Sequence, residues 1–458
     1  MNIIMKKYYL LGILILLFAS CIDDKSDLGL NHISQIKFKT QFEKDPYRCD
    51  QWSEFKLEAP EIEQTYQAKP VSYRWEINYQ EVSKEKDLTY LCTELTQDQG
   101  VQGRLIVSNE DGEAYLDFRL KVTSPYEEGL VVLSQFNNGS MVSFKREDIE
   151  NTKFQLNAYS LNNPLVSLGK KPTALLQQAG KLYIATEDPT QIVLVNDKTF
   201  AAEKKIPNPD PELKYMIGNS SGSFGLTFLG GGKMLSFDNS QDGYMNAPQK
   251  MLEMMYPGAY LADKGMRLYN GKYSDDILFY DNTFGMLLYG EWQCSSLLPE
   301  TFKGKTLVDM IPCKHGEEAL VFVQHKTTGI IEIVDISPLV PVIHSVTPVT
   351  GSGITTHSAF LASQESVILY YSVGNKVFRY DYSSQGHFQS QPDFIVGKDG
   401  DVIKTMILSP DESKLYIAVN SSDGEYIGDV YCFDNKTRTE LWHETGIAGE
   451  IVEMIYKE

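Results

Sequence analysis

Seven segments of this chain repeat one form: an apolar strand, a short polar or glycine-rich turn, and a second apolar strand. They cover residues 129–145, 181–197, 224–239, 266–282, 319–335, 366–381 and 414–435. The ends of the second strands recur at intervals of about 48 residues, and four-stranded propeller blades have a period of roughly 40–50 residues. A repeat of this kind predicts one ring of sheets, and the number of segments predicts seven blades.

The ends of the repeat array predict how the ring closes. A further strand precedes most pairs, but segment 129–145 has none, because Gly129 follows directly on the preceding domain. The run Ile451–Tyr456 is a leading strand with no pair after it. We therefore expect this C-terminal strand to complete the first blade, which would cover two sheet edges that otherwise invite aggregation.

Five of the seven segments end with an apolar residue followed by Asp, while Lys145 and Asn196 take this position in the first two. We interpret these Asp residues as turn residues that accept hydrogen bonds from their own backbone. They are Asp238, Asp281, Asp335, Asp381 and Asp434.

Residues 33–124 have a different pattern, and residues 125–458 form the predicted propeller. Short runs alternate between apolar and polar side chains, as in 71–77, 103–107 and 114–122, which is typical of strands with one buried face. About ninety residues of such strands predict an immunoglobulin-like sandwich. Trp75 would be either a core residue or a sugar-stacking platform, and its place on a central strand favours the core.

The first 20 residues have the layout of a signal peptide. Lys6 and Lys7 precede an apolar run, Tyr8–Ala19, which is too short to span a bilayer. Leu17-Phe-Ala-Ser then leads into Cys21, which resembles a bacterial lipobox and makes Cys21 the expected lipidation site. Acidic residues follow in a tether, 21–32. They resemble the export signal that takes Bacteroidetes lipoproteins to the outer face of the outer membrane.

The charge excludes one class of partner. The chain has 42 Lys and Arg against 61 Asp and Glu, a net charge of -19, and no basic stripe that would contact nucleic acid. Removing residues 1–20, which hold two Lys and no acids, makes the charge −21. We expect a folded body held at the membrane by its lipid anchor only.

Catalytic and metal-binding motifs are missing from the sequence, so we expect no enzymatic activity, no metal and no cofactor. Cys313, His315, His325 and Cys294 lack paired zinc-ligand spacings. The run from Asp238 to Gly243 matches half of a calcium loop, but Gln249 stands where its bidentate Glu belongs. Cys49 could form a disulfide with Cys92, and Cys294 with Cys313. Alternatively, these cysteines are isolated thiols.

A ligand site is expected where the loops between second and third strands gather on one face of the ring. These loops are taken to include 270–276, 324–326 and 423–426. Their Tyr, His and carboxylate side chains could stack on and hydrogen-bond a polar ligand. The candidate residues are Tyr273, Asp275, His325, Glu425 and Tyr426.

The lipobox, the strand Tyr73-x-Trp75-x-Ile77 and the junction 124–134 together resemble the PKD-like family lipoproteins of Bacteroidetes, over nearly the full chain. The resemblance implies a spacer sandwich and a C-terminal propeller that works beside a TonB-dependent (SusC/SusD-like) transporter and its lid lipoprotein. A surface binding protein that captures peptide or glycan for nutrient uptake would fit. The alternatives are a propeller hydrolase or lyase acting on the same nutrients, and a protein-docking subunit of the transporter complex.

Overall fold

The structure is a computed structural model that describes residues 32–207, 214–218, 226–238, 243–245, 247–268, 277–290, 295–384 and 386–458. Residues 1–31, which include Cys21 and most of the expected tether, lie outside the described residues. The chain divides into two compact units, with the boundary between Thr123 and Ser124.

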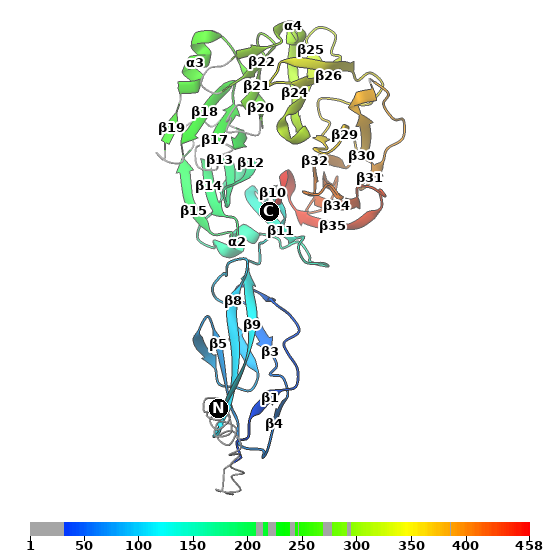
Figure 1. Ribbon diagram of the computed structural model, residues 1–458. Helices are drawn as coiled ribbons and strands as arrows, with labels where there is room; N and C mark the ends of the chain where they lie inside the picture. Colours follow the sequence, from blue (N-terminus) through cyan, green and yellow to red (C-terminus); the bar gives the residue numbers. More distant parts are fainter. Residues whose placement is uncertain are drawn as a thin grey trace, which may run out of the picture. The chain divides into compact units, whose positions relative to one another are not determined.

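The first unit is a β-sandwich (Figure 1). One layer is a five-stranded sheet in the order β2 (Tyr47–Asp50), β9 (Gly112–Thr123), β8 (Val101–Asn109), β5 (Ser72–Ile77) and β6 (Gln80–Ser83). Two short pairs face it, β1 (Ile36–Phe38) with β4 (Ile62–Gln64) and β3 (Glu54–Leu57) with β7 (Leu88–Leu91). All strand pairs of this unit are antiparallel except β2 with β9.

Trp75 lies at the centre of this sandwich. Its side chain is fully buried, and its ring lies edge-on to Phe118, 6.1 Å between centroids. The indole Nε1 donates to the carbonyl oxygens of Glu85 and Lys86, so its one polar group is satisfied inside the core. The prediction of a core tryptophan is confirmed.

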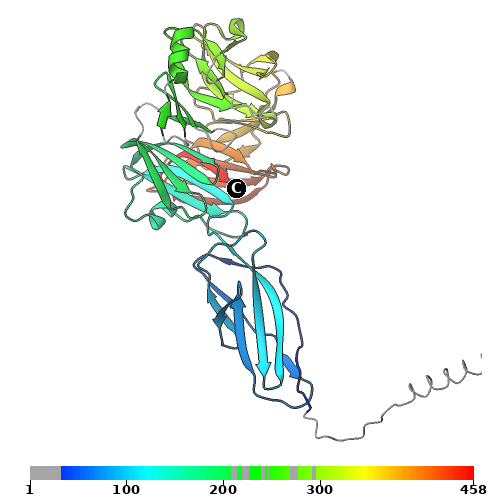
Figure 2. The same cartoon turned by 60° about the vertical axis from the view of Figure 1, so that its left-hand side comes forward.

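The described residues of the second unit form a propeller of seven blades, as the repeats predict (Figures 1 and 2). Blade one has three strands, β36 (Glu450–Lys457), β10 (Gly129–Phe136) and β11 (Gly139–Arg146). The other six have four strands each. They are β12 (Lys170–Gln178), β13 (Lys181–Asp188), β14 (Thr190–Asn196), β15 (Ala202–Pro207); β16 (Tyr215–Gly218), β17 (Leu226–Gly230), β18 (Lys233–Asp238), β19 (Gly243–Met245); β20 (Leu261–Arg267), β21 (Ile277–Asp281), β22 (Met286–Tyr289), β23 (Ser295–Leu297). The remaining three are β24 (Lys305–Cys313), β25 (Glu318–His325), β26 (Ile331–Ser337), β27 (Val342–Pro348); β28 (Phe360–Ala362), β29 (Ile368–Val373), β30 (Lys376–Asp381), β31 (Phe394–Ile395); β32 (Val402–Leu408), β33 (Lys414–Asn420), β34 (Gly428–Asp434), β35 (Glu440–Ala448).

The C-terminal strand closes the ring, as expected. β36 is the innermost strand of blade one and pairs antiparallel with β10, from Gly129 opposite Lys457 to Gln135 opposite Glu450. It also contacts β12 of blade two and β32 of blade seven. Gly449 makes the close approach possible, because a Cβ there would lie 2.1 Å from the Gln135 carbonyl oxygen.

The two faces of the ring are distinguished by their connections. We call the face where second and third strands are joined the upper face, and the face where first and second strands are joined the lower face. The prediction that residues 270–276 join a second to a third strand is wrong. In the sequence they stand between β20 and β21, the first and second strands of blade four, and they lie outside the described residues. The prediction failed because a pattern of strand, turn and strand fits the first and second strands of a blade as well as the second and third.

Three of the recurring Asp residues act as turn residues, as interpreted. The Asp281 carboxylate accepts from the backbone N–H groups of Thr283 and Phe284, Asp381 from Ser383, and Asp434 from residues 436 and 437. Asp335 is an exception, because it lies inside β26 and is buried.

Helices are few and short in the described ranges: α2 (Ala158–Asn162), α3 (Ala247–Met255), α4 (Pro299–Phe302), η1 (Lys314–Gly316) and η2 (Tyr382–Ser384). None of these described helices has the length and apolar character needed to cross a membrane. Among the described cysteines, Cys49, Cys92, Cys313 and Cys432 are free thiols. Burial and a hydrogen bond with Cys49 raise the pKa of Cys92 to about 12, so these two thiols are in contact. Cys294 lies outside the described residues.

Candidate functional site

A cavity of about 460 Å³ lies on the lower face, where blade one meets blade seven. Blade one contributes the end of β11 and the segment 147–153, and blade seven contributes the starts of β33 and β35. These two blades are brought together by the closure of the ring. The side chains that give the cavity its chemistry are Lys145, Glu147, Thr152, Lys414, Trp442 and Glu444.

Lys145 forms the floor of the cavity and is almost completely buried, with 5% of its side chain exposed. Its Nζ lies 3.5 Å from Glu444 Oε1 and 4.0 Å from Glu147 Oε1. It also donates to the carbonyl and hydroxyl oxygens of Thr152 and lies 4.7 Å from the centroid of the Trp442 ring. A buried ammonium is tolerated only with such partners, two carboxylates and an aromatic face in this case.

Glu147 links the floor to blade seven. Its Oε2 accepts hydrogen bonds from Lys414 Nζ and from the Tyr416 hydroxyl, both at 2.7 Å. Burial lowers the pKa of Lys414, but the Glu147 carboxylate outweighs it and raises the pKa overall. Burial and the same carboxylate raise the pKa of Tyr416. The floor thus contains two ammonium and two carboxylate groups, so its formal charges cancel.

Trp442 gives the cavity an aromatic wall. The ring is partly buried, and its centroid lies 6.1 Å from that of Tyr416 and 6.4 Å from that of Phe154. Ile149 and Leu441 also line the cavity and are 44% and 49% exposed. An apolar rim above a polar floor suits a ligand that offers both C–H surface and hydrogen-bonding groups.

The central channel carries a second set of polar side chains, contributed by first strands of different blades. Glu453 is on β36, Tyr215 on β16, Lys264 on β20 and Asp309 on β24. Lys264 Nζ lies 2.7 Å from Asp309 Oδ2, and Glu453 Oε2 accepts from the backbone N–H of Leu175. Burial raises the pKa of Glu453 to about 7, and burial with the Glu453 and Asp309 carboxylates raises that of Tyr215.

The raised pKa of Glu453 predicts a pH-dependent cost to stability. The folded state holds this proton more tightly than the unfolded state, so the stability it contributes is present below about pH 4.5 and lost as the pH rises to about 7. Glu453→Gln keeps an acceptor for the Leu175 N–H. We expect it to stabilise the protein by about 2 kcal/mol at pH 8 and to change little at pH 4. Urea unfolding at both pH values measures this.

Glu450→Gln is the matched control, because Glu450 lies on the same strand with its side chain exposed. It is expected to leave stability unchanged at both pH values. Equal effects of Glu453→Gln at pH 4 and pH 8 would contradict an ionised, poorly solvated Glu453.

His325, a predicted ligand residue, is engaged in an ion pair within blade five. Its Nε2 lies 3.1 Å from Glu332 Oε1, and Lys305 Nζ lies 2.6 Å from Glu332 Oε2. Burial raises the pKa of Glu332, but Lys305 and His325 together outweigh it and hold the pKa below its usual value. His325 ends β25, next to the upper face.

Glu425 and Tyr426 lie in the loop between β33 and β34, on the upper face of blade seven. Glu425 is exposed. The Tyr426 ring stacks on Phe136 at the end of β10, with centroids 4.1 Å apart and planes 12° from parallel. Tyr426 therefore also joins blade seven to blade one. His325 is two blades away, so the structure does not place these three residues in one described cavity.

Several other predicted positions fall on or beside segments that are not described. Tyr273 and Asp275 lie outside the described residues, as do residues 239–242 of the half calcium loop. Of the scattered zinc candidates, His315 Nε2 lies 3.1 Å from Glu365 Oε1 and Cys313 is buried. Burial and the Asp335 carboxylate raise the pKa of the Cys313 thiol to about 12.

The residues of the cavity were not found from the sequence, although one signal pointed to them. Lys145 stands where five later segments have Asp. A cation in this position requires acidic partners, and Glu147 is two residues away. The other partners, Trp442 and Glu444, are about 300 residues further along the chain.

Comparisons with known proteins find structural similarity at low sequence identity only. No protein-family model matches the chain, and no curated protein matches it. Similar solved structures include a quinonprotein alcohol dehydrogenase-like protein from Bacteroides thetaiotaomicron, with 14% identity, TM-score 0.47, and coverage of 93% of this chain and 97% of that one. Dihydro-heme d1 dehydrogenase NirN has 9% identity, TM-score 0.46, and coverage of 73% and 75%. The Myceliophteria thermophila Cps50 (Swd1) propeller domain has 10% identity, TM-score 0.43, and coverage of 61% and 88%.

Proposed function

We propose that this protein is a non-enzymatic binding protein that captures a glycan or peptide in the cavity between blades one and seven. The observation that carries the proposal is the partly exposed indole of Trp442 above a charge-balanced polar floor. Aromatic faces stack on the C–H surface of sugars and on apolar side chains, and the floor offers hydrogen bonds without a net charge. A neutral, polar ligand such as a short glycan segment fits this chemistry best.

The state of the carboxylates supports binding over hydrolysis. A glycosidase needs two carboxyl groups that face the substrate. Glu147 has 4% of its side chain exposed and is bound to Lys414 and Tyr416, while Glu444 contacts Lys145 and the Phe154 N–H. Both carboxylates are therefore engaged in contacts within the protein, including the contacts that stabilise the buried Lys145. A hydrolase or lyase stays the second candidate, and release of product from a bound glycan would favour it.

The proposed location follows from the sequence. The lipobox at Cys21 and the acidic residues after it support a lipid-anchored protein of the outer membrane that faces the cell exterior. The resemblance to PKD-like family lipoproteins supports a role beside a TonB-dependent transporter and its lid lipoprotein. A pull-down from native outer membrane tests this. Recovery of the transporter without any soluble ligand would favour the docking-subunit alternative.

Trp442→Ala is expected to weaken glycan binding at least ten-fold, because loss of an aromatic stacking face costs about 1.5 kcal/mol or more. A glycan and peptide array identifies the ligand, and titration calorimetry measures the change. Trp52→Ala is the matched control, since Trp52 is 68% exposed in the first unit, and it should leave affinity unchanged. Equal affinity in both variants would refute the cavity as the binding site.

A further inference from the structure

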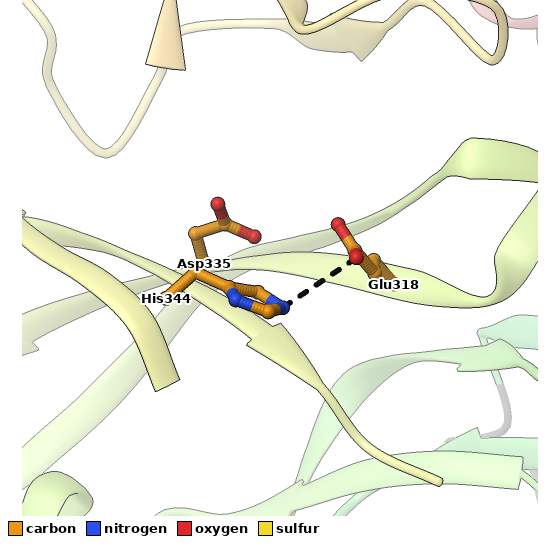
Figure 3. Close-up of side chains that lie close together, drawn as sticks. All are labelled: Glu318, Asp335 and His344. Atoms are coloured by element: carbon orange, nitrogen blue, oxygen red, sulfur yellow. Dashed lines mark ion pairs between the residues drawn. The ribbon is translucent and has the colours of Figure 1, made fainter. Parts of the chain in front are cut away.

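A second group of side chains, unrelated to the cavity, converges on the lower face of blade five (Figure 3). Glu318 begins β25, Asp335 lies in β26 and His344 lies in β27. A carboxylate oxygen from each acid and a ring nitrogen of His344 all lie within 4.8 Å of one another. His344 Nε2 is 3.5 Å from Glu318 Oε1.

A β-bulge places His344 in this group. In the pairing of β26 with β27, Asp335 lies opposite Ser345 and Ile336 lies opposite Ile343, so His344 is an extra residue with no partner. Bulges re-aim a side chain and are frequent on edge strands, and β27 is the outer strand of its blade. The bulge thus brings the imidazole to the carboxylates.

The environment of the Asp335 carboxylate points to a ligand. The residue is 6% exposed, and its Oδ1 is buried with no hydrogen-bond partner among the residues that the structure describes. A buried carboxylate oxygen without a partner is costly, and three of the equivalent Asp residues in other segments satisfy theirs with turn N–H groups. Its carboxylate points to the side of the sheet where Glu318 and His344 lie (Figure 3).

We propose that Glu318, Asp335 and His344 form a binding site for a divalent transition metal of the zinc class, with one position open to solvent. This goes beyond the proposed function and departs from the sequence-based expectation of no metal site. Imidazole nitrogen and carboxylate oxygen are both ligands of Zn²⁺, at about 2.0–2.2 Å. The three atoms lie within 4.8 Å of one another, so small side-chain rotations would bring them to these distances around a metal. His344 is 40% exposed, which gives the metal a route in and leaves room for water.

A nucleophile–base–acid arrangement is a poorer explanation of the same residues. Ser337 Oγ lies 2.8 Å from His344 Nε2, and the Glu318 carboxylate approaches the same nitrogen. A catalytic triad needs the acid on the other ring nitrogen, where it orients the base. Groups that converge on one nitrogen are instead arranged as they would be around a cation.

Lys314 is the competitor for this site. Its Nζ lies 2.5 Å from Glu318 Oε2, so in the absence of metal it supplies the positive charge. Its side chain is 43% exposed and free to leave. Lys314→Ala is therefore expected to tighten Zn²⁺ binding two- to five-fold, the opposite of the effect of removing a ligand.

Titration of chelator-treated protein with Zn²⁺ against a chromophoric chelator tests the site. We expect one bound equivalent whose affinity falls at least ten-fold in His344→Ala and in Asp335→Asn. His357→Ala, which removes an exposed histidine elsewhere in the ring, should have no effect. Co²⁺ should give the visible bands of tetrahedral coordination in the original protein and lose them in His344→Ala.

Two outcomes would overturn the proposal. The first is an affinity for Zn²⁺ that is the same with and without His344, which would assign binding to scattered surface histidines. The second is binding of Ca²⁺ but not Zn²⁺, because an oxygen-only site would not need the imidazole. His344 is exposed, so its replacement keeps the test valid even if Asp335→Asn fails to fold.

Discussion

A chain that ends at Gly449 is expected to lose the folded propeller. This truncation removes β36, whose Ile451 and Met454 are 0% and 2% exposed, and each such buried side chain contributes about 1.5–3 kcal/mol. It also exposes the inner edge of β10 and opens the contacts with β12 and β32. The loss is comparable with the whole stability of a domain, about 5–15 kcal/mol.

Hydrogen exchange measured by mass spectrometry resolves this result by region. Peptides from residues 124–449 should lose protection together, while peptides from the first unit, around the buried Trp75, should keep theirs. A chain lacking only Glu458 is the control and should exchange as the full chain does. Retained protection of blades two to six in the shorter chain would show that the ring does not depend on its closing strand.

Lys145→Met is expected to destabilise the protein by about 3–5 kcal/mol, the usual cost of breaking a buried ion pair by removing one partner. Methionine approximates the shape of the lysine stem but supplies no charge. The buried carboxylates of Glu147 and Glu444 would then lose a shared cation, and Trp442 its ammonium contact. The free energy of unfolding, measured by urea titration at pH 7, gives the change.

Two further variants make this measurement specific. Lys170→Met removes a half-exposed lysine whose partner Asp188 lies 3.6 Å away, and we expect a change of about 1 kcal/mol or less. Adding Glu444→Gln to Lys145→Met should recover part of the lost unfolding free energy, because it removes one carboxylate that no longer has Lys145 as a partner. A Lys145→Met protein as stable as Lys170→Met would mean that water enters the cavity and solvates the carboxylates.

The ring was predictable from the sequence because its signals are local. Each blade contains strands with runs of four or five apolar residues that recur at a period of about 48 residues, and Ile451–Tyr456 stood out as a strand without a pair. The wrong prediction for blade four also arose because the signal is local. Segment 266–282 has the same pattern of two apolar runs, but its runs belong to the first and second strands of the blade and were taken for the second and third.

Neither site was predictable, because both depend on contacts between distant residues. Glu147 and Glu444 are two of 61 acidic residues, and the closure of the ring brings their blades together. A β-bulge places His344 near Asp335. No residue pattern in Val342–Pro348 predicts this bulge. The sequence did contain two irregularities, namely Lys145 in an Asp position and Asp335, which is followed by the aliphatic residue Ile336.

The closure of blade one has a consequence for how this protein is made. β36 is synthesised after all the other strands of the ring, so the inner partner of β10 arrives about 300 residues later. Until then the inner edge of β10 is a free template for pairing with other chains. The yield of folded protein should therefore depend on chaperones that bind the unfinished ring more than its final stability suggests.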